Sequence, residues 1–356
     1  MERVSIRETL IVLAAIVVVG LVTVLVLSRD GAPPTRWRFE FGAPASAGPL
    51  LDGDRVFAAS EGGAVVALDA ATGDLSWRVS IDGTPRGLIR SDKARLYLST
   101  DEGDAVALDI EGGAVAWRAT FDGGLNAPLV VDDLVVIATH RGAVVGLDAA
   151  TGDERWRNET GRVLRADPAV IEGATRMVGV GDTGGRLHTF DAASGEAGPE
   201  PTSLGGEIAG PALAADGIVL VVPRPDVVAL AADGHEVWRT ATGEPNRVPM
   251  VARAGVLYVD ASPDLVAIDL ANGAARWRYT SPAVVVTFGI GEHLAVAGMH
   301  TGEVHGIDLD TGERLWRYRT NESVRGAPVI DDTTGLAYFA GLDGNVYAIE
   351  VGEPGE

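Results

Sequence analysis

Five polar residues recur at one place in a repeated pattern, and together they could bind a negatively charged group. Each lies two or three residues before the short apolar segment that opens a repeated unit: Arg86, Asn126, Arg165, Arg247 and Arg325. Guanidinium groups bind carboxylates and phosphates through paired N–H donors. The alternative is that each arginine pairs with a nearby aspartate such as Asp167, or with backbone carbonyl groups. The pattern predicts either an anion-binding site at one mouth of a central channel or a set of structural ion pairs. These five positions are called the mouth residues below.

Two other patterns resemble functional sites but fit turns better. Residues 179–184 have the spacing of a dinucleotide-binding glycine motif, but that motif requires a following helix, and residues 186–191 are typical of a strand and a turn. His300 and His305 could suggest a metal pair. However, the position of His300 in the repeat is held by other polar residues in other units, so we interpret this position as part of a solvated turn. The chain has six histidines and no cysteine to act as a thiolate ligand, so we predict no metal site.

Composition narrows the classes of function. The chain of 356 residues contains no cysteine, which excludes disulfides, thiolate metal sites, cysteine nucleophiles and a lipid-modified N-terminal cysteine. Its formal net charge is −21, so nucleic acid and anionic lipid are disfavoured as partners. The sequence predicts no bound cofactor.

The tryptophans define the repeat that positions the candidate residues. All seven are followed by arginine, and the gaps between them are 40, 40, 39, 82, 39 and 39 residues. They are Trp37, Trp77, Trp117, Trp156, Trp238, Trp277 and Trp316. A period near 40 is typical of stacked or radial repeats. Residues 35–351 fit eight such units.

Each unit is predicted to contain four strands. Residues 65–68 form a short apolar strand, Asp69 caps a tight turn, Gly73 supplies a positive φ, and Trp77 lies on the returning strand. In the fourth unit, Gly198 and Pro199 stand where the tryptophan is expected. The N-terminal strand carrying Trp37 is expected to complete the last unit, which removes the open edge of the ring.

The repeated Ala-x-Asp-x-x-Thr-Gly-x-x-x-Trp-Arg pattern resembles the PQQ-like β-propeller repeat over about nine-tenths of the chain. That family includes eight-bladed quinoprotein alcohol dehydrogenases and non-catalytic scaffolds, one of which serves the bacterial outer-membrane β-barrel assembly machinery. The resemblance implies an all-β, eight-bladed propeller of four-stranded blades. It also implies that all seven tryptophans dock neighbouring blades.

The same resemblance raises an enzymatic alternative. Family dehydrogenases hold pyrroloquinoline quinone (PQQ) between a tryptophan and a disulfide of adjacent cysteines, with calcium and a catalytic aspartate. This chain has no cysteine and no long insertions between repeats. We therefore predict no enzymatic activity, and PQQ is not expected. A PQQ-dependent oxidoreductase, its catalytically dead relative, and an anionic small-ligand sensor remain the alternatives.

Residues 9–28 form an uncharged, apolar run long enough to cross a bilayer as a helix. We expect a cytoplasmic N-terminus (1–8), a single-pass signal anchor (9–28), a stalk (29–34), an extracytoplasmic propeller (35–351) and an acidic tail (352–356). A cleaved signal peptide is the alternative reading of the apolar run. The predicted function is a membrane-anchored, non-catalytic interaction scaffold for a protein partner in the cell envelope or membrane.

Overall fold

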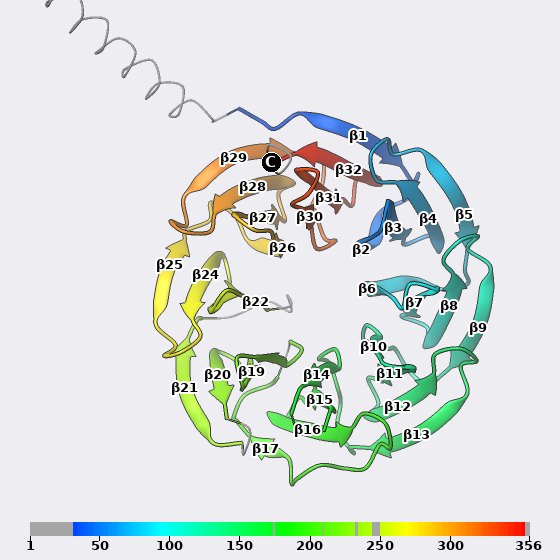
Figure 1. Ribbon diagram of the computed structural model, residues 1–356, viewed down its shortest axis with the longest axis vertical. Coiled ribbons are helices and arrows are strands. Elements are labelled where there is room, and N and C mark those ends of the chain that lie inside the picture. The colour runs from blue at the N-terminus through cyan, green and yellow to red at the C-terminus, as the bar shows by residue number, and fades with distance from the viewer. Residues whose placement is uncertain (1–30, 174, 209, 232–233, 244–249, 353–356) are drawn as a thin grey trace, which may run out of the picture.

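The strands of this protein are arranged radially around a central axis. The computed structural model describes residues 31–173, 175–208, 210–231, 234–243 and 250–352. Figure 1 shows short strands near the axis and long strands at the rim. Within the described residues the regular structure is entirely β, as the strand and turn pattern predicts.

Strands occur in groups of four that run from the axis to the rim, and each group is called a blade. The innermost strands of blades 1 to 8 are β2 (Ala45–Asp52), β6 (Pro85–Ser91), β10 (Leu129–Val131), β14 (Ala169–Ile171), β18 (Leu213–Ala215), β22 (Val251–Arg253), β26 (Val285–Ile290) and β30 (Val329–Asp331). The second strands are β3 (Arg55–Ser60), β7 (Arg95–Thr100), β11 (Leu134–Ala138), β15 (Met177–Gly181), β19 (Ile218–Val221), β23 (Val256–Ala261), β27 (Leu294–Met299) and β31 (Leu336–Ala340).

The third strands of the blades are β4 (Ala64–Asp69), β8 (Asp104–Asp109), β12 (Ala143–Asp148), β16 (Arg186–Asp191), β20 (Asp226–Leu230), β24 (Asp264–Asp269), β28 (Glu303–Asp308) and β32 (Asn345–Glu350). The outer strands of blades 1 to 7 are β5 (Leu75–Ser80), β9 (Val115–Thr120), β13 (Glu154–Glu159), β17 (Thr202–Ser203), β21 (Glu236–Ala241), β25 (Ala275–Tyr279) and β29 (Arg314–Arg319). Blade 8 takes its outer strand, β1 (Thr35–Glu40), from the start of the described chain.

The hydrogen bonds join these strands into seven sheets rather than eight. Six sheets have four strands, and the seventh has eight because β2 and β6 pair in parallel through Ala47–Gly87 and Gly48–Leu88. Each blade still has four strands, but blades 1 and 2 are joined into one sheet, which the sequence pattern did not predict. Small residues at the contact let the two backbones approach each other, and β2 and β6 are longer than most of the other inner strands.

The expected transmembrane helix preceding the propeller is not supported. The described residues form no helix at all, so none of them provides a helix long and apolar enough to cross a membrane. Residues 9–28, on which that prediction rested, lie outside the described residues. Apolar composition and length allow a spanning helix but do not by themselves produce one.

The ring closes where its two ends meet. Strand β1 pairs with β32 antiparallel, with Trp37 opposite Ala348 and Phe39 opposite Val346. The predicted completion of the last unit by the N-terminal strand is therefore confirmed. In Figure 1 the blue β1 lies beside the red β32. This pairing covers the outer edge of β32, which would otherwise be open to another chain.

The apolar core lies between the blades. The second and third strands are buried on both faces, as in the five consecutive buried residues 64–68, because each blade is covered by a neighbour on either side. One cluster joins Val66 and Leu68 of blade 1 to Tyr338 and Ala348 of blade 8. The outer strands alternate instead, with one face directed to solvent.

Six of the repeat turns receive the tryptophan of the preceding blade, as the first turn shows. Asp69 Oδ1 accepts hydrogen bonds from the backbone N–H groups of Ala71 and Thr72 at 3.0 and 2.8 Å, and Gly73 has a φ of +75°. A Cβ atom at Gly73 would lie 2.6 Å from the Trp37 ring, and Trp37 Nε1 donates to Ala70 O at 2.8 Å. The turn glycine therefore serves both the backbone conformation and the neighbouring indole ring.

The same tryptophan–glycine contact occurs six times. Nε1 of Trp37, Trp77, Trp117, Trp156, Trp238 and Trp277 donates to a carbonyl of the next blade at 2.8–3.1 Å. Trp316 differs, since its Nε1 is buried and has no hydrogen-bond partner among the described residues. Blade 8 follows Trp316, and its third and outer strands are not joined by a turn because the outer strand is β1.

Candidate functional site

The mouth residues predicted from the sequence lie where the chain passes from the rim of one blade to the inner strand of the next. Arg86, at the start of β6, donates from Nε to Asp101 Oδ2 at 2.6 Å. Both side chains are partly exposed, at 40% and 46%. Arg86 therefore forms the local ion pair that the alternative interpretation anticipates, and its guanidinium is already occupied by a carboxylate.

Asn126 has a different environment from the arginines. Its side chain is buried, and Nδ2 donates to the Leu164 carbonyl at 3.3 Å. Its backbone N–H donates to Ala138 O at 3.0 Å. Asn126 thus links the approach to blade 3 with the approach to blade 4 and does not face solvent.

Arg165 and Arg325 are the mouth residues with free guanidinium groups. Both are exposed, and neither has an ion pair or side-chain hydrogen bond among the described residues. Arg165 precedes β14 of blade 4, and Arg325 precedes β30 of blade 8. In an eight-blade ring these blades lie on opposite sides of the axis, as Figure 1 shows for β14 and β30. Arg247 lies outside the described residues.

One pair of partly buried charges near the axis was missed by sequence reasoning. Asp167 accepts a hydrogen bond from the Ala127 N–H at 2.8 Å, and burial raises the pKa of its carboxyl while the charge of Arg90 opposes this shift. Burial lowers the pKa of Arg90, whose buried Nε has no hydrogen-bond partner in the described structure. Asp167 therefore interacts with Arg90 and not with Arg165. The available signal was Arg90 itself, at a position that holds an uncharged residue in the other units, such as Leu50 and Leu129.

The remaining sequence motifs adopt the expected turn structures. Residues 179–184 span the end of β15 and the turn into β16, so no helix follows the glycine motif. Asp182 in this turn is buried, and its Oδ2 lies 2.8 Å from His188 Nε2. His300 is exposed in a turn while His305 is fully buried beside Tyr279. No group of three potential metal ligands gathers within the described ranges.

A sequence-family profile described as "Outer membrane protein assembly factor BamB" matches residues 22–88, 83–201 and 199–355, which together cover most of the chain. The chain belongs to the BamB family. This confirms the resemblance of its repeat to the PQQ-like propellers, of which the BamB family is one branch. The BamB of Burkholderia pseudomallei (strain K96243) is 27% identical over 227 residues, which are 61% of this chain. The match spans about half of that relative, 48% of its length.

Two solved structures share the fold. BamB from Moraxella catarrhalis has a TM-score of 0.74 at 20% identity and covers 92% of this chain and 100% of its own. Quinohemoprotein alcohol dehydrogenase from Comamonas testosteroni has a TM-score of 0.72 at 16% identity and covers 92% of this chain and 77% of its own. At these identities the likeness concerns the fold, which BamB proteins and quinoprotein enzymes have in common.

The residues of this chain do not fit the quinone that such enzymes bind. The tryptophans lie on outer strands, and six of them are engaged in docking a neighbouring blade. The chain lacks the cysteines needed for an adjacent disulfide. The pair of Arg90 and Asp167 offers one carboxylate, which is already hydrogen-bonded to Ala127.

Proposed function

We propose that this chain is a non-catalytic interaction scaffold of the cell envelope, and that its mouth face binds acidic side chains of a partner protein. The observation that carries the proposal is the pair of exposed, unpaired arginines, Arg165 and Arg325, in a protein with a net charge of −21. Several other arginines, such as Arg155 and Arg176, have carboxylates within hydrogen-bond distance. Free guanidinium groups are available to carboxylates of another chain.

The positions of these arginines favour an extended partner over a small anion. Arg165 and Arg325 belong to blades on opposite sides of the ring, so one small anion does not bridge them. The sensor alternative requires convergent groups, and Arg86 and Asn126 are committed to Asp101 and Leu164. A protein surface with separated acidic groups matches both arginines at once. Membership of the BamB family supports a partner that takes part in outer-membrane protein assembly.

Site-specific photocrosslinking in the native host tests this proposal. A photoreactive residue introduced two positions before Arg165 or Arg325, at Val163 or Ser323, is expected to crosslink the same envelope protein. The double charge reversal Arg165→Glu/Arg325→Glu should reduce the crosslinked fraction at least tenfold. The matched control is Arg141→Glu, since Arg141 is exposed but already pairs with Asp122 at 3.1 Å. Unchanged crosslinking in the double variant would overturn the proposed role of the mouth face.

A further inference from the structure

The fourth blade lacks the docking tryptophan that the repeat places in the outer strand. Pro199 stands at that position, and the outer strand β17 is reduced to Thr202–Ser203. The third strand β16 bridges Ala197 through Phe190 and then Thr202 through Leu187, so residues 198–201 fall outside the regular pairing. Two prolines in that stretch cannot donate to a strand ladder, which accounts for the departure of the chain.

Blade 5 keeps the glycine of the missing contact, but in a shorter turn. Gly234 has a φ of +85° and lies four residues before Trp238, as Gly73 lies four before Trp77. However, its N–H donates to Ala231 O at 2.9 Å, three residues back, whereas Gly73 N–H donates to Asp69 O, four residues back. In the six complete contacts, a Cβ atom at the turn glycine would lie 2.6–2.7 Å from an indole ring of the preceding blade. At Gly234 the nearest atom to such a Cβ is Thr202 Oγ1 at 3.3 Å. Blade 5 therefore presents a positive-φ glycine at this place with no indole against it.

A cavity occupies this place. It has a volume of about 200 Å³ and lies between Leu187, Thr189 and Pro199 of blade 4 and Leu230 and Gly234 of blade 5. A dry, aliphatic cavity of about 150 Å³ is large enough to bind benzene. The available volume is therefore sufficient for a larger ring.

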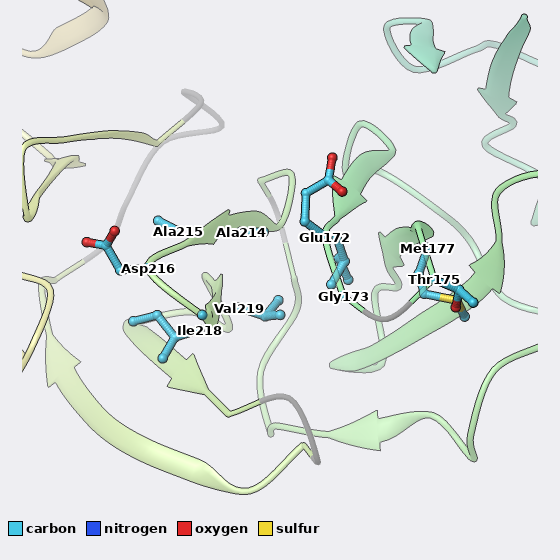
Figure 2. Close-up of a pocket in the computed structure, with 11 residues that line it drawn as sticks. Glu172, Gly173, Thr175, Met177, Ala214, Ala215, Asp216, Ile218 and Val219 are labelled. Carbon is cyan, nitrogen blue, oxygen red and sulfur yellow. The ribbon is translucent and has the colours of Figure 1, made fainter. Parts of the chain in front are cut away.

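The cavity is reached through a wider opening between the same two blades. This opening, of about 540 Å³, lies between the β14–β15 hairpin and the β18–β19 hairpin, as Figure 2 shows. It shares Ile171, Met177 and Val219 with the smaller cavity, so the two are contiguous.

We propose that the cavity between blades 4 and 5 is a binding site for an indole ring. The other blades of the same chain provide the template, since each complete contact holds an indole against a positive-φ glycine. The hydroxyl groups of Thr189 and Thr202, and the exposed carboxylate of Glu200, lie along the cavity and can accept the indole N–H. The ligand is a free indole compound or a tryptophan side chain of a partner. This site is independent of the mouth arginines.

The test is to titrate the full 356-residue chain with 5-fluoroindole and to monitor binding by fluorine NMR. We expect saturable binding with a Kd of about 1 mM or tighter. Pro199→Trp should fill the cavity from within and weaken binding at least tenfold. Thr202→Phe, which directs a ring toward Gly234, is a second blocking variant. Val115→Trp adds a tryptophan at an exposed outer-strand position and should leave binding unchanged.

A positive control shows that the assay detects such a site, and a second probe separates the two ligand sources. Trp117→Ala opens an equivalent contact between blades 2 and 3 and should add a second binding site for 5-fluoroindole. N-acetyl-tryptophanamide separates the two ligand sources: binding of both probes supports a tryptophan side chain, and binding of 5-fluoroindole alone supports a free indole compound. Absence of saturable binding by the unmodified chain, or full binding by both blocking variants, would overturn the proposal.

Discussion

At the scale of single residues, the repeat is maintained by a contact between positions that are distant in sequence. Gly152 has a φ of +78°, and a Cβ atom there would lie 2.7 Å from the Trp117 ring. Glycine is thus required twice, by the left-handed backbone and by the indole that lies on it. Neither requirement alone explains why a turn glycine and a tryptophan recur together.

This double requirement predicts non-additive mutations at Gly152 and Trp117. Gly152→Ala should lower the free energy of unfolding by about 2–4 kcal/mol, because backbone strain and overpacking combine. Trp117→Ala should cost about 3–5 kcal/mol. In the double variant the ring is gone, so the combined loss should be smaller than the sum by about 1–2 kcal/mol. Urea denaturation of the four proteins measures this coupling.

The matched control for the Gly152 experiment is Gly53→Ala. Gly53 has a φ of +62°, but no atom lies within 4 Å of the position of its Cβ. Only the strain of the left-handed backbone remains there, so the loss should be about 1 kcal/mol. Equal losses at Gly53 and Gly152, or strict additivity with Trp117→Ala, would contradict the interlocking role of the glycine.

Sequence reasoning identified these residue types but not their partners. The tryptophan slot and the turn glycine are visible because they recur every 40 residues or so. The partners of Arg86, Arg90 and Asp167 are not visible in the sequence. Each pair joins residues 15 or more positions apart, and packing decides which of them meet. A periodic feature can be predicted from one sequence, whereas a contact made once cannot.

At the scale of elements, neighbouring blades are also joined by polar groups buried in the core. Strand β28 carries His305, whose ring is fully buried. Its Nδ1 atom forms a 2.6 Å hydrogen bond with the hydroxyl group of Tyr279 on β25. Burial, and next the positive charge of Arg314, lowers the pKa of His305 to about 4. The histidine is therefore neutral when the blades are packed.

This arrangement predicts acid sensitivity in a defined window. Between pH 6.5 and 4 the unfolded chain protonates His305 while the folded chain does not, so stability falls as the pH falls through this range. The contribution is on the order of 3 kcal/mol, because the two pKa values differ by about 2.5 and one pKa unit corresponds to 1.36 kcal/mol. His305→Gln keeps a hydrogen-bond acceptor for Tyr279 but does not titrate. Its unfolding free energy should fall less than that of the wild type over this window.

The control for His305 is His300→Gln, which alters an exposed histidine in the turn before β28. Chemical denaturation at half-unit pH steps should give this variant the same pH profile as the wild type. If His305→Gln also follows the wild-type profile, another group accounts for the acid sensitivity and the buried histidine does not.

The pairing of elements shows where pattern reasoning ends. The alternation of strands and turns predicted the four-stranded units and the closure of β1 on β32. It did not predict that β2 and β6 join two blades into one sheet, because the pairing of Ala47 with Gly87 and of Gly48 with Leu88 depends on how the two blades pack. The shortening of β17 to two residues follows from Pro199 and Pro201, whose consequence for packing required the neighbouring blade to be in place.

At the scale of the whole molecule, one fold is shared by scaffolds and by quinone enzymes, so architecture does not decide between them. The choice depends on which side chains the ring directs to its functional positions. In this chain six tryptophans are engaged between blades. Near the axis, the opposite charges of Arg90 and Asp167 attract each other.

Calorimetric titration of the chain with PQQ in the presence of calcium tests this distinction. We expect no saturable heat at ligand concentrations up to about 1 mM, because the chain has no cysteine pair to cover one face of the quinone, and its seven tryptophans lie on outer strands away from the axis. A PQQ-dependent alcohol dehydrogenase titrated under the same conditions is the positive control. Micromolar affinity corresponds to about −8 kcal/mol, which requires several convergent contacts. Such a value would contradict the scaffold and assign a cofactor to the ring.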